Sequence, residues 1–213
     1  DKRGFPFVFI GFGDNWEGFG TKTHAITNYI NDPSSNINDD TYIICLDSRD
    51  VICNGNVTDT LNILKKFDEN KLIISTEKGC CVPSTTVSMR SYMEERASKK
   101  NLENKYLNAG MIAGKAKVFK KIYPFNMRKT DDDQTGLIKW WQDHPDDIEL
   151  DYDELLFSNA NFWNKDHEKG CPYKISKKLP NERIPQFIQT PAKFWKCYDN
   201  LYSKSKYFVT WKL

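Results

Sequence analysis

Short apolar runs alternate with helical periodicities along the first half of the chain. Each run is rich in aromatic or β-branched residues and ends at glycine or polar residues, as buried strands do. The runs are Phe5–Gly13, Thr41–Leu46 and Lys71–Ser75. Between them, apolar residues recur at helical spacing after Thr21 and again from Leu61 to Phe67. This alternation predicts an α/β fold with a central, mostly parallel sheet flanked by helices, and ligands at the carboxyl ends of the strands.

The second half of the chain is less regular. Met89–Lys100 is charged and resembles a surface helix, and apolar residues follow Thr130 at helical spacing. Tyr106–Gly114 is rich in small residues, which is typical of a strand that another backbone or a ligand approaches closely. The proline-rich C-terminal part predicts an irregular wrap that ends in a strand, Tyr207–Trp211.

The composition is that of one globular domain. A chain of 213 residues, 39% of them hydrophobic, has enough apolar surface to bury a core. Its 31 basic and 29 acidic residues nearly cancel, so it lacks the basic excess with which proteins bind nucleic acid. No apolar run approaches the length of a membrane span. We therefore expect no nucleic-acid partner and no membrane span.

The cysteines indicate reduced thiols and a cytoplasmic location. Cys45 lies inside an apolar run, Cys80 and Cys81 are adjacent, and no pair has the C-x-x-C spacing of a structural zinc site. A domain of this size also has enough core to fold without disulfides.

Two acidic residues directly follow the apolar run at Thr41–Leu46. Asp47 and Asp50 flank a short turn at the predicted carboxyl end of that strand. Carboxylates in such a place are the ligands that a hard divalent cation needs, and the cation can in turn bind a diphosphate. The alternative is that both acids cap the turn.

Further motifs follow one another in an order that resembles a known family. The matching segments are Gly13–Gly18, Gly20–Lys22, Ile43–Phe67, Ser75–Glu77 with Cys81 and Pro83, Tyr106–Gly110, Asp131–Gln134, Leu150–Asp151, Phe157 and Asn159. Together they are similar to the glycosyltransferase domains of procollagen lysyl hydroxylase-glucosyltransferases and of collagen galactosyltransferase-like proteins. Each motif alone is weak, but their order is specific.

The resemblance implies a GT-A fold and a sugar-transfer reaction. In that family a UDP-sugar is the donor and Mn2+, or Mg2+ in its place, binds at a short acidic motif, here Asp47 and Asp50. We expect transfer of a hexose or deoxyhexose of the glucose, galactose or rhamnose type to a glycan or protein-linked hydroxyl. We also expect one domain, with a nucleotide-sugar core over residues 1–165 and a closing segment over 166–213, in a virus-encoded chain that can carry further domains.

The resemblance also assigns site residues. The donor-binding candidates are Trp16, Gly20, Lys22, Asp47, Ser48, Glu77, Asn108, Gly110 and Lys193. The catalytic candidates are Asp131, Asp132 and Asp133, with Asp132 favoured as the residue that binds the sugar or accepts the proton of the acceptor hydroxyl. Each has an ordinary alternative: a solvated lysine, a core tryptophan, a tight strand turn at the glycine, or acids that satisfy free N–H groups at a helix start.

Two departures from the family bear on function. A histidine completes the family's metal site, but the matching region, Phe187–Lys193, contains none, and His24, His144 and His167 lie elsewhere. The family's first strand, which forms part of the uridine pocket, also has no clear counterpart. The missing histidine keeps open a non-catalytic carbohydrate-binding module of the same fold. A metal-dependent phosphohydrolase that uses the same acids is a further alternative.

Overall fold

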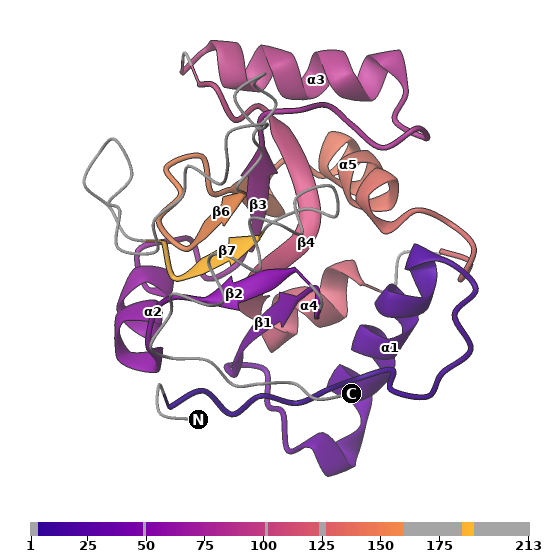
Figure 1. Cartoon of the computed structure of the whole chain (residues 1–213), viewed down its shortest axis with the longest axis vertical. Helices are drawn as coiled ribbons and strands as arrows, with labels where there is room; N and C mark the ends of the chain where they lie inside the picture. The colour runs from indigo at the N-terminus through magenta and orange to yellow at the C-terminus, as the bar shows by residue number, and fades with distance from the viewer. Residues whose placement is uncertain (1–3, 49, 101, 124–126, 160–184, 190–213) are drawn as a thin grey trace, which may run out of the picture.

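The computed structural model describes residues 4–48, 50–100, 102–123, 127–159 and 185–189, whose elements are arranged as Figure 1 shows. The helices are α1 (Phe19–Asn31), the 3-10 helix η1 (Pro33–Ser35), α2 (Val57–Leu64), α3 (Val87–Ser98), α4 (Ala116–Ile122) and α5 (Asp133–Asp143). The strands are β1 (Tyr42–Leu46), β2 (Val51–Cys53), β3 (Leu72–Glu77), β4 (Tyr106–Lys115), β5 (Ile148–Leu150), β6 (Phe157–Asn159) and β7 (Phe187–Gln189).

The main sheet has four strands in the order β1-β4-β3-β5. Strands β1, β3 and β5 run in the same direction, and β4 lies antiparallel between β1 and β3. The predicted α/β fold is therefore confirmed, but the sheet is mixed rather than mostly parallel, because β4 makes antiparallel pairs with both of its neighbours and only β3 and β5 pair in parallel. Strand β1 lies at the edge of this sheet and its residues are half-buried, yet Ile43 and Cys45 pack against the core on one face and Tyr42, Ile44 and Leu46 against the core on the other.

Alternating residues of the main sheet build a separate core on each face. Leu72 and Ile74 of β3 pack with residues of α1, α3, α4 and α5, whereas Ile73, between them, packs with residues of α2, β6 and β7. This period of two is the pattern that a strand covered on both faces imposes. In Figure 1 the small sheet and α2 accordingly lie on one side of β3 and β4, with α5 and α1 on the other.

A second sheet joins segments that are far apart in the chain, in the order β2-β7-β6. Strand β7 pairs antiparallel with β2 and parallel with β6. It belongs to the region predicted as an irregular wrap, so that prediction is wrong over 187–189, because these residues form the central strand of the small sheet. The rest of the predicted wrap, with the strand at Tyr207–Trp211, lies outside the described residues.

The predicted strand at Phe5–Gly13 is wrong. Residues 5–10 pair with no strand in the described part of the chain, and only Phe5 is buried, with its ring 5.6 Å from that of Phe187. Gly11 and Gly13 have positive φ values of 71° and 85°, so the backbone turns where an extended strand would continue. Residues 7–10 and Phe12 consequently expose apolar side chains.

Two further predictions concern the cysteines and a membrane span. The prediction of reduced thiols is wrong for Cys80 and Cys81, because a disulfide joins these adjacent residues, while Cys45 and Cys53 form no disulfide with any described residue. Cys171 and Cys197 lie outside the described residues. Among the helices that the structure describes, none is long and apolar enough to cross a membrane.

Candidate functional site

The site begins where β1 ends and β4 is irregular. The pairing of β3 with β4 shifts register between Ile74 and Ser75, whose partners are Ile112 and Asn108. This irregularity takes residues 109–111 out of the ladder with β3. The Gly110 carbonyl oxygen then accepts the N–H of Asp47 at 2.8 Å, which fixes the first acidic residue beyond β1. The predicted placement of Asp47 at a carboxyl strand end is confirmed.

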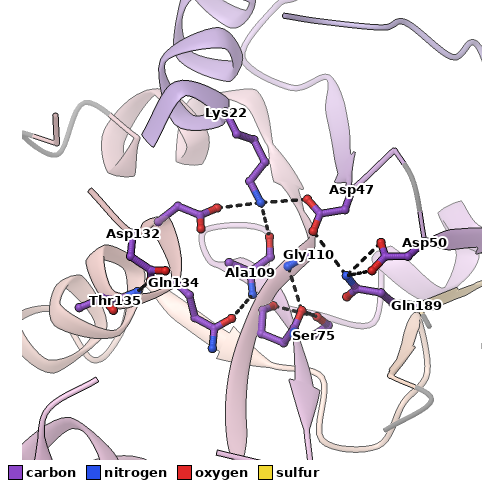
Figure 2. Close-up of polar contacts among 12 residues, drawn as sticks. Lys22, Asp47, Asp50, Ser75, Ala109, Gly110, Asp132, Gln134, Thr135 and Gln189 are labelled. Carbon is purple, nitrogen blue, oxygen red and sulfur yellow. Dashed lines mark hydrogen bonds and ion pairs between the residues drawn. The ribbon is translucent and has the colours of Figure 1, made fainter. Parts of the chain in front are cut away.

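Lys22 of α1 points its ammonium into this region (Figure 2). Its Nζ lies 3.0 Å from Oδ1 of Asp47, 2.7 Å from Oδ2 of Asp133 and 3.1 Å from the carbonyl oxygen of Ala109. Burial alone would lower the pKa of Lys22, but the two carboxylates outweigh it and raise the pKa above its usual value. The lysine is therefore a fixed positive charge rather than a solvated surface residue.

Asp50 and Asp47 share the side-chain amide of Gln189 (Figure 2). Nε2 of Gln189 lies 3.4 Å from Oδ2 of Asp47 and 3.3 Å from both carboxylate oxygens of Asp50. Burial, with a contribution from the Asp47 charge, raises the pKa of Asp50 to about 6. The structure thus brings together the two acids predicted to bind metal.

These donors fit a hard divalent cation. Two carboxylates converge on one amide group, and carboxylate and amide oxygens are the ligands that Mg2+ and Mn2+ prefer. The described residues include no cluster of three or more histidine, cysteine or acidic side chains of the kind that would hold a metal by itself. Among the described residues, Asp47 and Asp50 are therefore the acids that could hold such a cation, and the Gln189 amide turns its nitrogen towards both of them.

The three acids of the predicted catalytic run have three different environments. Asp131 pairs with Arg128 at 2.8 Å, and hydrogen bonds from Arg128 lower its pKa. Asp132 is the N-cap of α5, since its Oδ1 accepts the N–H of Thr135 at 2.8 Å. Asp133 is buried, which raises its pKa, and it pairs with Lys22. Only the third carboxylate thus contacts the lysine beside Asp47.

The sugar-binding candidates lie along β3 and β4. Oδ1 of Asn108 accepts the N–H of Gly110 at 2.9 Å, and Ser75 donates to the Asn108 carbonyl oxygen at 2.8 Å. Glu77 ends β3 and accepts a hydrogen bond from Gln134 at 3.3 Å. These contacts place Asn108, Gly110 and Glu77 on the strands that border the acid pair.

The loop candidates are placed less closely together. Trp16 is not a core residue, since it is 60% exposed and meets the Phe19 ring edge-on at 5.6 Å. Gly20 has a packing role, because a Cβ there would overlap the carbonyl oxygen of Arg128. Ser48 is exposed just beyond Asp47, and Lys193 lies outside the described residues.

The histidines do not reach the acid pair in the described structure. His24 contacts the carbonyl oxygen of Met127 at 2.7 Å, and His144 stacks on Trp140 with ring centroids 4.2 Å apart. His167 lies outside the described residues.

With this geometry in place, comparison with known proteins decides the family. A family model described as the PLOD GT domain matches residues 4–180. The chain belongs to this family of glycosyltransferase domains. It is accordingly a transferase with an α/β fold of the GT-A type. A search of curated proteins finds no match, and neither comparison supports the expected viral origin.

Sequence reasoning missed one central residue of this PLOD-type domain, Gln189. A lone glutamine in a proline-rich segment has no motif of its own. The available signal was positional: Gln189 lies within Phe187–Lys193, the segment that matches the family's histidine-containing stretch. In the structure β7 pairs Gln189 with Val51, the neighbour of Asp50, which brings the glutamine to the acids.

Proposed function

We propose that this domain is a metal-dependent glycosyltransferase that uses a UDP-sugar. It would transfer a hexose or deoxyhexose of the glucose, galactose or rhamnose type to a hydroxyl of a glycan or protein-linked acceptor. The observation that carries the proposal is the convergence of Asp47, Asp50 and the Lys22 ammonium beyond the carboxyl end of β1 in a chain of this family.

Asp47 and Asp50 would hold Mn2+ or Mg2+ through their carboxylate oxygens. Such a cation, when bound, supplies a Lewis acid for the negative charge that develops on the leaving diphosphate. Lys22 contributes a second positive charge on the same side. Asp133 and the Ala109 carbonyl oxygen hold its ammonium in position, so the charge is preorganised before the donor binds.

The acceptor side of the proposal uses the start of α5. Asp132 keeps one carboxylate oxygen on the helix N–H of Thr135, which fixes its orientation, and the other can hydrogen-bond a sugar or acceptor hydroxyl. Asn108 and Glu77 would position the sugar from β4 and β3. Trp16, Ser48 and Lys193 remain candidates for contacts with the nucleotide and its diphosphate.

A turnover assay separates this function from its alternatives. UDP release would be measured with UDP-glucose, UDP-galactose and UDP-rhamnose, with Mn2+ and a panel of glycan acceptors, for the wild type and Asp47→Asn. We expect acceptor-stimulated release from one donor by the wild type and loss of that release in the variant. Asp39→Asn is a matched control, because Asp39 is an exposed partner of Lys120 far from the acid pair in the fold.

Other outcomes would replace the proposal. Donor binding without release, in the presence of every acceptor, would indicate a carbohydrate-binding module. Phosphate release from simple phosphoesters, with no UDP release from any donor, would indicate a phosphohydrolase.

A further inference from the structure

The amide of Gln189 lies between two carboxylates that repel one another. It is held by backbone pairing in β7, where Gln189 lies opposite Val51, and its Nε2 donates to Asp47 and Asp50 at 3.3–3.4 Å. A single amide nitrogen thus offsets part of the repulsion between the acids.

The oxygen of the same amide is buried without a partner. Gln189 is only 4% exposed, and its Oε1 accepts no hydrogen bond from any residue that the structure describes. Buried polar atoms usually have a partner, and a lone one costs free energy or marks a site that binds something. Among the described residues of this site, Oε1 is therefore a ready oxygen ligand.

Packing against Gly110 holds the Gln189 amide in place but leaves the amide group able to rotate by half a turn. Both its nitrogen and its oxygen lie against the Cα of Gly110, where a Cβ would overlap both atoms. The last torsion of a glutamine side chain has a broad, roughly two-fold preference, so half a turn exchanges nitrogen and oxygen at little cost. The missing side chain at position 110 provides the room.

We propose that Gln189 is a ligand of the divalent cation at Asp47 and Asp50, and that its amide turns over to present Oε1 when the cation binds. Nε2 holds the two carboxylates together, and Oε1 takes its place towards the positive charge. The inference rests on the proposed metal site and adds its third protein ligand.

The ligand set has a consequence for metal choice. Two carboxylates and a carboxamide offer oxygen alone, and oxygen ligands suit Mg2+ and Mn2+, whereas an imidazole favours the later and softer transition metals. Position 189 should therefore set how strongly the site distinguishes Mn2+ from Mg2+.

The test is a titration of the protein with Mn2+ alone, in which the electron paramagnetic resonance signal of the free ion measures how much Mn2+ remains unbound. The chain is compared with Gln189→Ala, Gln189→Glu, Gln189→His and Asp47→Asn. We expect Gln189→Ala to weaken Mn2+ binding by about tenfold and Gln189→Glu to strengthen it. Gln189→His should raise the preference for Mn2+ over Mg2+ and add a directly coupled nitrogen to the spin-echo spectrum of the bound ion.

Gln186→Ala is the matched control, since the buried Gln186 amide contacts Thr60 instead of the acids. The Mn2+ affinity of this variant should equal that of the wild type.

The outcomes keep the two proposals apart. If Asp47→Asn abolishes binding while Gln189→Ala binds Mn2+ as tightly as the wild type or more tightly, the metal site stands and Gln189 is not its ligand. If Asp47→Asn leaves the affinity unchanged, the metal site itself is refuted and the inference with it. Should Gln189→Ala fail to fold, the nitrogen coupling in Gln189→His decides, and its absence from a bound Mn2+ spectrum refutes the inference.

Discussion

At the scale of single residues, the site has more negative than positive charge. Among the described residues, Asp47 and Asp133 contact the Lys22 ammonium, and Asp50 is linked to Asp47 through the Gln189 amide. Lys22 pairs with two of the three acids. The pKa of the third, Asp50, is raised chiefly by burial and also by the negative charge of Asp47. A surplus of buried negative charge is destabilising in a folded chain unless a cation offsets it.

Asp50→Asn should therefore separate stability from metal binding. Because the pKa of Asp50 is raised to about 6, its ionisation costs stability, and that cost develops as pH rises from about 4 to about 6. In the presence of a chelator at pH 7.5, we expect the free energy of unfolding of Asp50→Asn to exceed that of the wild type by on the order of 1–3 kcal/mol. At pH 4.5 the gain should shrink, because the wild-type carboxyl is then protonated.

Urea unfolding at the two pH values measures this difference, and Mn2+ titration of the same samples should show weaker binding in Asp50→Asn. The exposed Asp39→Asn serves again as control. Equal stability of Asp50→Asn and wild type at pH 7.5 would show that the ionised Asp50 carries no such cost.

At the scale of elements, α5 depends on an acid that is also a catalytic candidate. Asp132 caps the helix through the N–H of Thr135. Asparagine caps helices about as well as aspartate, whereas alanine does not. We expect Asp132→Ala to lose about 1 kcal/mol of unfolding free energy and Asp132→Asn to lose little.

The two variants separate the cap from the chemistry. If the Asp132 carboxylate accepts the acceptor proton, kcat for UDP release should fall by at least about 100-fold in both variants, although only Asp132→Ala is destabilised. Thermal unfolding and initial rates measure the two effects. If the kcat of Asp132→Asn is near the wild-type value, Asp132 caps the helix and takes no part in the chemistry.

The elements also show what the sequence could predict. Strands β1, β3 and β4 and helix α3 are long enough to stand out by composition, and each was predicted close to its observed bounds, while α1 and α5 were predicted from their helical spacing. Strands β2, β5, β6 and β7 have three residues each, too few to show a period of two. Phe5–Gly13 has the composition of a strand, but composition does not reveal whether a neighbouring strand is available.

The residues of the candidate site also fall into those that the sequence could predict and those that it could not. Asp47 and Asp50 could be predicted because they follow a recognisable strand. Gln189 could not, because it is 139 positions from Asp50, belongs to a strand too short to predict, and has a side chain that acts through position alone. The separation of Asp133 from Asp132 also escaped prediction, since neighbouring acids at a helix start look alike in sequence and diverge only in what they contact.

At the scale of the molecule, the site is a junction between the two sheets. Asp47 extends β1 of the main sheet, Asp50 precedes β2 of the small sheet, and Gln189 ends β7 beside it. Lys22 and Asp133 reach the junction from α1 and α5 on the opposite face of the main sheet. A ligand that binds between these groups contacts both sheets and the helix layer, so its binding should stabilise the whole domain.

Under the proposed function, this junction binds a nucleotide diphosphate through a divalent cation. Calorimetric titration of UDP into the protein, with Mn2+ and then with a chelator, tests it for the wild type and for Asp47→Ala combined with Asp50→Ala. We expect UDP binding by the wild type that depends on Mn2+ and disappears in the double variant. Binding of UDP that is equally tight with the chelator, or that survives in the double variant, would contradict it.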